Sequence, residues 1–448
     1  MTPRKRFIWR SLVLALALVG ALVATLPSNA GPSKRTRSSG IAPGVTLTVI
    51  RDYGGPFRIR IVSMQQGAEA RLDTVLANDR LPKFETTSSM AARTRAVAAI
   101  NGDYARPTGR PVHTFAFDGV LAQTPLAWGR NFAADHTGTS TYMGNPKVSG
   151  WARETDTGNT FPIDLVNAGA PSGDQIARYT REGGGIEKPP AGICQVRLYA
   201  SGSPYPLTES PGVETRHFVD RVRCGGKSIK PLGGSILATP LTSVHAPTLA
   251  ALTPGEEVTL GWSTGWRGVL DTIGGNPTLI EGGTVIEGNV AGSGPFFERH
   301  PRTGIGTTPD GKVLMVVVDG RQTGYSVGMT LREFANLFRS LGADWALNID
   351  GGGSSTLAID GRVINRPSDG YERGVSSALV VLPGADPGEA DPTPQPDSPL
   401  YTLTRHAVWP SIAEDPASTG GLADHLLRSG QPLAPSLRGA AAEFRRSR

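Results

Sequence analysis

The clearest hydrophobic pattern of the chain lies between residues 302 and 382. Residues 312–318 (KVLMVVV) form a continuous apolar run rich in β-branched residues, which predicts a strand buried on both faces. Apolar residues then recur at helical spacing after Thr330, which opens a capping box, until Gly342 supplies a C-terminal stop. Residues 345–349 predict a second strand. Strand, helix and strand at this spacing indicate a βαβ crossover, with two parallel strands in one sheet.

The rest of the main domain, residues 41–383, is β-rich. Short apolar runs alternate there with Gly, Pro, Asn and Asp, which is typical of strands and turns. Asp360-Gly361 lies between two such runs and predicts a hairpin. Residues 146–250 are rich in Gly and Pro, and we interpret them as a variable embellishment of the main domain or a separate small module. The expected fold class is α+β, with a β-rich mixed sheet that contains the crossover.

The two ends of the chain differ from this pattern. Residues 1–30 combine four basic residues, a short apolar run and small residues before Ala30, which predicts a secretory signal peptide. An uncleaved membrane anchor is the rival interpretation, but the apolar run is too short and too rich in Ala and Gly to favour it. Residues 31–40 are expected to form a polar linker, and residues 384–448 a disordered Pro-rich tail. We therefore expect a secreted protein with no stable membrane insertion after cleavage.

Charge and cysteine content narrow the possible partners. The leader holds four of the basic residues and no acidic one, so its removal lowers the net charge from +6 to +2. Together with the lack of a basic stripe interleaved with aromatics, this argues against a nucleic acid partner. Cys194 and Cys224 are the two cysteines, and in an oxidising compartment we expect them to form a disulfide. A catalytic thiol is the weaker interpretation, because no neighbouring feature marks either cysteine as activated.

The candidate chemistry centres on the run NIDGGGSST, residues 348–356. Three glycines allow positive φ and close approach of a ligand to the backbone, and the hydroxyls that follow can donate hydrogen bonds to an anion. Taken alone, the run could equally be a tight turn. Because strands flank it on both sides and no Gly-Lys-Ser/Thr follows, it is not a nucleotide-binding P-loop. The loop residues concerned are Gly351, Gly352, Gly353, Ser354 and Ser355.

Charged residues accompany this loop. Asp319 follows the first strand of the crossover and Asp350 follows the second, and parallel strands place both at one edge of the sheet, where ligands bind in open α/β sheets. Arginine is the side chain that best recognises phosphate, although exposed arginines are often paired with nearby acids. An Asn or Asp after a strand is often only a turn residue. The further candidates are Asn101, Asp103, Arg302, Arg321, Asn365, Arg366 and Arg373.

Other constellations are weaker. Residues 261–265 fit the pattern G-x-S-x-G, but no amphipathic helix follows, so the context of a nucleophile elbow is missing. The histidines are scattered singly, which disfavours a zinc site. Calcium bound by carboxylates and carbonyls is compatible with the composition, but no EF-hand loop supports it. The sequence requires no cofactor, and it leaves metal dependence undecided.

Six ordered motifs span much of the main domain and are densest after residue 300. They are AINGDY (99–104), IGGNPTLI (273–280), RTGIG (302–306), VVVDGRQ (316–322), LNIDGGGSSTL (347–357) and NRPSDGYERGVSSAL (365–379). Together they resemble the phosphodiester glycosidase family, whose members hydrolyse the bond between the anomeric carbon of a sugar and a phosphodiester oxygen.

The resemblance implies a hydrolase of sugar 1-phosphodiesters, and with the predicted leader we expect its substrate in a cell-wall or extracellular polysaccharide. A phosphate is a weakly basic leaving group, so charge stabilisation matters more than protonation. We expect Arg302, Arg321 and residues 351–353 to hold the phosphate, and Asp319 or Asp350 to direct water or stabilise positive charge on the sugar. Asn101, Asp103, Asn365 and Arg366 would orient the sugar. Two alternatives stay open: a non-catalytic polysaccharide-binding protein, and a phosphodiesterase that cleaves P–O.

Overall fold

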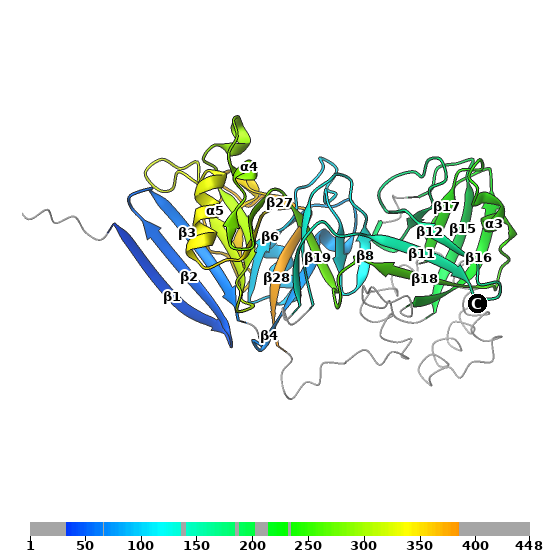
Figure 1. Cartoon of the computed structure of the whole chain (residues 1–448), viewed down its shortest axis with the longest axis horizontal. Helices are drawn as coiled ribbons and strands as arrows, with labels where there is room; N and C mark the ends of the chain where they lie inside the picture. Colours follow the sequence, from blue (N-terminus) through cyan, green and yellow to red (C-terminus); the bar gives the residue numbers. More distant parts are fainter. Residues whose placement is uncertain are drawn as a thin grey trace, which may run out of the picture.

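The computed structural model describes residues 33–65, 67–135, 140–183, 188–201, 214–231 and 234–384. The predicted signal peptide and, apart from Gly384, the predicted tail lie outside these residues. The described chain forms an elongated row of β-sheets with a few short helices on their faces (Figure 1). None of the helices in these ranges is both long and apolar enough to cross a membrane. The α+β class predicted from the sequence is confirmed.

The first sheet contains both strands of the predicted crossover. In spatial order its strands are β1 (Lys34–Ala42), β2 (Val45–Asp52), β3 (Phe57–Met64), β23 (Val313–Val318), β22 (Arg302–Thr307), β24 (Trp345–Asn348), β20 (Thr278–Glu281) and β21 (Thr284–Val285). Both β23 and β24 run antiparallel to β22, which lies between them. They are therefore parallel members of one sheet, as predicted, but they are not neighbours. Each strand pair of this sheet is antiparallel.

The expected linker of residues 31–40 contains a strand over most of its described length. From Lys34 onward it forms β1, which pairs along its length with β2. Its side chains are almost all exposed, so the sequence shows the polarity of a connector although its backbone is paired. Such a polar outer strand suits the edge of a sheet, where apolar residues would promote aggregation.

A second sheet packs face to face with the first. Its strands, in spatial order, are β26 (Arg362–Val363), β25 (Leu357–Ile359), β6 (Ala98–Asn101), β28 (Ser377–Pro383) and β4 (Ala70–Leu76). Val62 and Met315 from the first sheet share one buried cluster with Ile100 and Leu379 from the second. Strands β25 and β26 form the hairpin predicted at Asp360-Gly361. Residues of the site can therefore come from both layers of the sandwich.

Helices cover the outer faces of this sandwich. On the first sheet, Phe334 of α5 (Leu331–Ser340) packs in one cluster with Leu314 and Val316, so β23 is buried on both faces as predicted. The predicted capping box at Thr330 is present. The other short helices are α3 (Ala246–Ala251), α4 (Glu287–Val290), η2 (Ala77–Asp79), η3 (Arg181–Gly183) and η4 (Pro295–Phe297).

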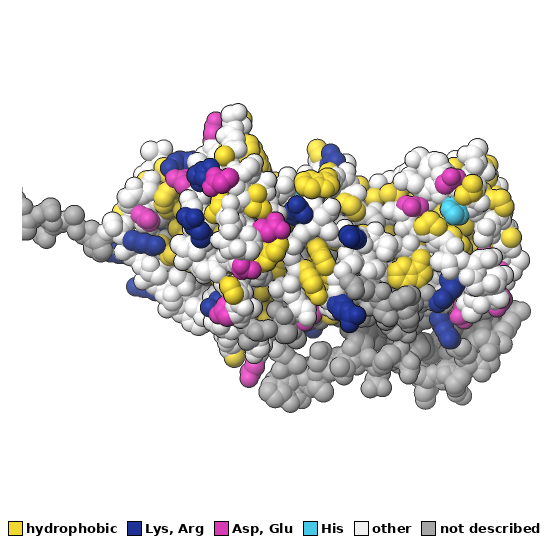
Figure 2. All heavy atoms as spheres, viewed as in Figure 1, with side chains coloured by type: hydrophobic (Ala, Val, Ile, Leu, Met, Phe, Trp, Pro, Cys, Tyr) yellow, Lys and Arg dark blue, Asp and Glu magenta, His cyan; other side chains and the backbone are white. Residues whose placement is uncertain are grey.

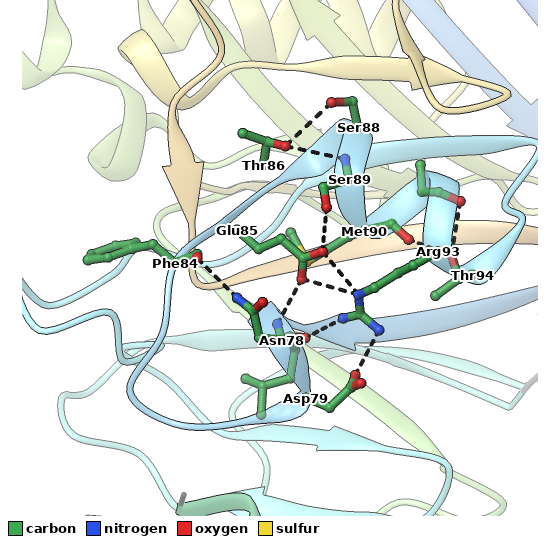
Figure 3. A network of polar contacts seen from close by, with 12 residues as sticks. Asn78, Asp79, Phe84, Glu85, Thr86, Ser88, Ser89, Met90, Arg93 and Thr94 are labelled. Atoms are coloured by element: carbon green, nitrogen blue, oxygen red, sulfur yellow. Dashed lines mark hydrogen bonds and ion pairs between the residues drawn. The ribbon is translucent and has the colours of Figure 1, made fainter. Parts of the chain in front are cut away.

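Helix α2 (Thr87–Thr94) covers the second sheet, and a polar network fixes its position (Figure 3). Thr86 caps its first turn with a side-chain oxygen. Near its C-terminal end, Arg93 donates to Glu85 at 3.1 Å and to Asp79 at 2.9 Å. The helix is thereby tied to β5 (Glu85–Thr86), which pairs with β27 (Gly374–Val375) just ahead of β28.

A third sheet joins the sandwich to a separate lobe. Its strands, in spatial order, are β10 (Thr141–Gly144), β9 (Arg130–Ala134), β19 (Asp271–Gly275), β7 (Phe115–Phe117) and β8 (Val120–Gln123). One face of the sheet contributes Phe132 and Ile273 to the core of the sandwich. The other face contributes Leu121 and Ala133 to the core of the lobe.

The lobe contains most of the region interpreted as an embellishment, and it occupies the end of the molecule opposite β1 (Figure 1). Its strands are β12 (Thr160–Ile163), β11 (Ser149–Glu154), β18 (Glu257–Ser263), β16 (Glu214–Cys224), β15 (Cys194–Ser201), β17 (Ser235–Thr239), β14 (Ala177–Tyr179) and β13 (Leu165–Val166). The predicted disulfide between Cys194 and Cys224 is confirmed, and it joins residues that face each other on β15 and β16. The lobe thus has its own sheet, core and covalent link.

Candidate functional site

The glycine run connects the two layers of the sandwich. Residues 351–356 leave β24 in the first sheet and enter β25 in the second, with η5 (Gly352–Ser354) as a single turn between them. Gly352 has φ +63°, which favours glycine. A Cβ at Gly353 would lie 2.2 Å from Nη2 of Arg373, so a larger residue here would displace the end of that side chain.

Much of the backbone of this loop is committed to bonds inside the protein. The amide of Gly352 donates to the carbonyl of Pro301 at 2.9 Å, and those of Ser354 and Ser355 donate to loop carbonyls at 3.2 Å. Ser354 and Ser355 are both buried. The loop is therefore well ordered, and an anion beside it would depend mainly on the side chains around it.

Asp350 is the acidic side chain of the site that combines access with a perturbed pKa. It follows β24, is partly exposed, and burial of its carboxyl raises its pKa to about 6. A hydrogen bond from Ser354 and the nearby charge of Arg373 oppose this rise, whereas Asp103 adds to it. A carboxyl group that titrates near neutral pH is suited to proton transfer.

Asp319 has a different environment, although its strand ends at the same edge. Its carboxylate is fully buried and accepts from Arg60 at 2.6 Å, from the hydroxyl of Tyr325 at 3.2 Å and from Asn365 at 3.0 Å. The backbone amide of Arg366 donates to it as well, at 3.0 Å. These donors occupy both oxygens, so Asp319 holds surrounding segments in place and has no oxygen turned toward a ligand.

The two candidate asparagines also bind the protein itself. Asn101 is buried, donates to the carbonyl of Asp350 at 2.7 Å and accepts from Thr303 at 2.9 Å. Asn365 donates to the carbonyl of Ser355 at 2.9 Å and accepts from the amide of Leu357 at 2.8 Å. Both side chains therefore fix the backbone that presents Asp350 and the glycine run. The structure gives them this role in place of the sugar contact expected from the sequence.

The candidate arginines separate by burial. Arg302 is buried, and it donates to carbonyls of Met329, Phe296 and Glu298 at 2.7 to 2.9 Å. Burial lowers its pKa to about 10. It thus holds the chain before β22, and its Nε and Nη2 are engaged by these carbonyls.

Three exposed arginines surround the glycine run. Arg321 lies against Gly352, where a Cβ would be 3.1 Å from its Nη2. Arg373 lies against Gly353 and pairs with Asp369 at 2.5 Å. Arg366 lies over the ring of Tyr325, with 5.1 Å from Cζ to the centroid. Arg321 and Arg373 are therefore the guanidinium groups nearest the loop by this measure.

His300 orients Arg321 and was missed by the sequence analysis. Its Nδ1 accepts from Nε of Arg321 at 3.2 Å, and its Nε2 lies 2.5 Å from the carbonyl of Pro295. One ring nitrogen accepts and the other donates, so the imidazole is neutral in this arrangement. Burial lowers its pKa, which agrees with the neutral form. Its place just ahead of the RTGIG motif was the only sequence signal that could have found it.

A second buried group lies beside Asp350. Asp103 accepts from Nδ1 of His113 at 2.6 Å and from the amide of the same residue at 2.7 Å. Next to it, the hydroxyl of Tyr104 donates to the carbonyl of Asn276 at 2.8 Å and accepts from Asn348 at 2.7 Å. Burial, and then the charge of Asp350, raise the pKa of Tyr104, so its hydroxyl stays protonated. Asp103 was predicted, but His113 was not, because a lone histidine carries no local signal.

Metal binding has no evident location among these residues. In the part of the chain that the structure describes, no three His, Cys, Asp or Glu side chains come together in an arrangement that could hold a metal ion.

The comparison with protein families locates the same region. Residues 214–382 match the family model described as phosphodiester glycosidase. This stretch includes β22, β23, α5, β24 and the glycine run, so the predicted resemblance is confirmed over these residues. Among curated proteins, the SPbeta prophage-derived uncharacterized protein YomE of Bacillus subtilis is 43% identical over 83 residues. The matched stretch covers 18% of this chain and 13% of that protein.

Solved structures share the fold over a longer part of the chain. A putative exported protein from Burkholderia pseudomallei K96243 aligns with a TM-score of 0.59 and 18% identity, over 80% of this chain and 99% of that one. A hypothetical protein from Synechocystis aligns with a TM-score of 0.58 and 22% identity, over 79% of this chain and 64% of that one. At these identities the likeness concerns the fold alone.

Proposed function

We propose that this protein is a phosphodiester glycosidase that hydrolyses the anomeric C–O bond of a sugar 1-phosphodiester in a cell-wall or extracellular polysaccharide. The observation that carries the proposal is the surroundings of Asp350. Asp350 is a partly exposed residue whose buried carboxyl has a pKa of about 6, and the glycines that follow it are flanked by the exposed Arg321 and Arg373. The family match over residues 214–382 supports the same chemistry.

The roles that we propose for the side chains follow from their charges. Cationic side chains bind the phosphodiester and stabilise the phosphate monoester as it leaves. Asp350, as a carboxylate, stabilises positive charge that develops on the sugar ring and takes a proton from the attacking water. The water oxygen bonds to the anomeric carbon, the bond from that carbon to the phosphate oxygen breaks, and the bonding electrons stay with the phosphate. Asp319 holds the loops in place and takes no part in bond cleavage.

Isotope labelling tests the bond that is cleaved. The purified protein is incubated with synthetic hexose and N-acetylhexosamine 1-phosphodiesters in oxygen-18 water, and both products are analysed by mass spectrometry. We expect the label in the sugar. Label in the phosphate would replace the proposal with a phosphodiesterase, and binding without turnover would replace it with a polysaccharide-binding protein.

Paired variants connect this turnover to the site. Asp350→Asn and Arg321→Ala should each abolish most of the hydrolysis without lowering the thermal transition by more than a few degrees, because Asn preserves the size of the Asp350 side chain and Arg321 is exposed. Leu241→Ala serves as a matched control, since Leu241 is 52% exposed and follows β17 in the lobe. Full activity of both site variants would show that the chemistry lies elsewhere.

Export is the second part of the proposal. A disulfide joins Cys194 and Cys224, as is usual in oxidising compartments, and a protein of similar fold carries the description of a putative exported protein. The signal peptide predicted for residues 1–30 would direct export. Expression of the full chain in a bacterial host, followed by fractionation and N-terminal sequencing, should yield extracellular protein cleaved near Ala30. Uncleaved protein in the membrane fraction would favour an anchor.

A further inference from the structure

Trp128 is a large aromatic side chain placed at the surface. It is 70% exposed, and Cζ of Arg130 lies 5.3 Å from the centroid of its ring. Single exposed apolar residues are common and require no special explanation. The position of this pair relative to Asp350 is what distinguishes it.

Strand register places Arg130 on the face of the third sheet that looks toward the sandwich. Arg130 is directly opposite Gly275, just as Phe132 is opposite Ile273. Phe132 and Ile273 are buried in the core shared with the sandwich, and residues two apart on a strand lie on the same face. Arg130 and Gly275 therefore lie on that face too, at the end of the strands.

Gly275 connects this face to the site. A Cβ at Gly275 would lie 2.5 Å from the carbonyl oxygen of Asn348, two residues ahead of Asp350. The next residue, Asn276, accepts hydrogen bonds at its carbonyl from Tyr104 at 2.8 Å and from Asn348 at 2.9 Å. The strand end that carries Arg130, with Trp128 against it, therefore lies next to the backbone that leads to Asp350.

The backbone under Trp128 is fixed. The amides of Leu126 and Ala127 donate to the carbonyl of Val112 at 2.9 and 3.2 Å. On the other side, a Cβ at Gly129 would lie 2.0 Å from Nε2 of His113, so this glycine packs directly on the buried Asp103–His113 pair. The indole therefore projects from an ordered loop, and because the ring is exposed it contributes little to the core.

Arg130 is the charged group in contact with the ring. The segment that carries the ring, residues 104–134, also contains Arg106 and the buried Arg110, whereas Asp118 is the only acidic residue in it. The face shown in Figure 2 has hydrophobic and basic side chains, with some acidic ones, over the middle of the molecule. An aromatic ring combined with a guanidinium group in such a setting fits a ligand that has both an apolar face and a negative charge.

We propose that Trp128 and Arg130 form a second subsite, which binds the neighbouring sugar-phosphate unit of a polymeric substrate. Arg130 covers one face of the indole, and the open face stacks on a sugar ring, while the guanidinium group pairs with the phosphodiester beyond it. This assignment rests on the proposed function and specifies its substrate as a chain of sugars joined through phosphodiesters. Trp128 is then a specificity residue that acts on binding of the polymer.

Kinetics on matched substrates test the subsite. One substrate is the methyl phosphodiester of the hexose or N-acetylhexosamine that the enzyme hydrolyses best, and the other is a synthetic trimer of the same sugar joined through 1-phosphodiesters. For Trp128→Ala we expect kcat/KM on the trimer to fall at least ten-fold more than on the methyl compound, through KM. Trp128→Phe should restore most of the difference. An equal fall on both substrates, or no fall, would overturn the proposal.

A control variant and a binding measurement separate this test from the proposed function. Tyr53 is also half exposed beneath a guanidinium group, that of Arg58 at 5.1 Å, so Tyr53→Ala should leave the ratio between the two substrates at the wild-type value. If the wild-type protein hydrolyses neither compound, calorimetric titration with the trimer decides. Weaker binding by Trp128→Ala than by wild type then supports the subsite without a glycosidase, and equal binding rejects it.

Discussion

The protonation of Asp350 should govern the activity at the residue scale. Because burial raises its pKa to about 6, the carboxylate that the mechanism requires forms as the pH rises through that value. We expect kcat/KM to increase from pH 5 to pH 7 with an apparent pKa near 6. Asp350→Asn should lose roughly 10²–10⁴-fold of the activity and this pH dependence together. An acidic limb that persists in the residual activity would assign the titration to another group.

The raised pKa of Asp350 also predicts that the stability of the folded protein falls as the pH rises, whereas the activity increases. In the folded protein Asp350 holds its proton to about pH 6, whereas its ordinary value is 3.8. The folded state therefore binds more protons between these values, and its stability falls as the pH rises through this interval. Asp350→Asn removes that loss, so it should be more stable than wild type at pH 7.5 by up to about 3 kcal/mol, and equal below about pH 4. Thermal unfolding over this pH range measures the difference.

Asp319 should behave as a structural residue. Asp319→Asn leaves the guanidinium group of Arg60, whose side chain is 11% exposed, without its countercharge. We expect the free energy of unfolding to decrease by roughly 3–5 kcal/mol, as measured by urea denaturation. Adding Arg60→Met to Asp319→Asn should recover part of the lost free energy of unfolding. If Asp319→Asn kept its stability and still lost activity, the carboxylate would have to be assigned a catalytic role.

At the scale of elements, the turn between β24 and β25 permits one sharp test. Gly353→Ala places a methyl group 2.2 Å from Arg373 and 2.3 Å from Asp369, which must move apart. We expect little change in stability, because the methyl group meets only the ends of two flexible side chains, but a clear loss of hydrolysis, because the arginine is displaced from the loop. Gly288→Ala provides the comparison, since a Cβ there meets no atom within 4 Å. Wild-type kinetics in Gly353→Ala would separate the arginine from the reaction.

The elements that the sequence predicted are those specified by nearby residues. Helix α5 has its capping box and its apolar stripe within a few residues, and the turn at Asp360-Gly361 has its own signature. The position of β22 between β23 and β24 depends on contacts between strands, which no local pattern encodes.

The same reasoning applies to the site. The glycine run and both aspartates were predicted because strands of recognisable pattern precede them. Arg60, which pairs with Asp319, is 259 residues away in sequence. Nothing in the local sequence distinguished Asp319, with its donors, from Asp350, which is partly exposed.

At the scale of the whole molecule, the lobe should unfold as a unit of its own. It has a separate core, and its disulfide closes a loop with a sequence separation of 30. Replacing Cys194 and Cys224 with alanine should lower the stability of the lobe by roughly 3 kcal/mol. Calorimetry should show one transition shifted to lower temperature and another unchanged, with hydrolysis of the methyl phosphodiester retained. A single transition that shifts as a whole would mean that lobe and sandwich unfold together.

Because the glycine run passes from one sheet to the other, the geometry of the site depends on how the two layers are aligned. Asp350 is fixed to the first layer through β24, and Arg373 is fixed to the second through β27 and β28. The separation of acid and arginine thus follows the thickness of the core between them. Substitutions that change the volume of the core should therefore change catalysis at a distance. We expect directed evolution of this protein to improve turnover through buried residues such as Val62 or Leu379, which no substrate contacts.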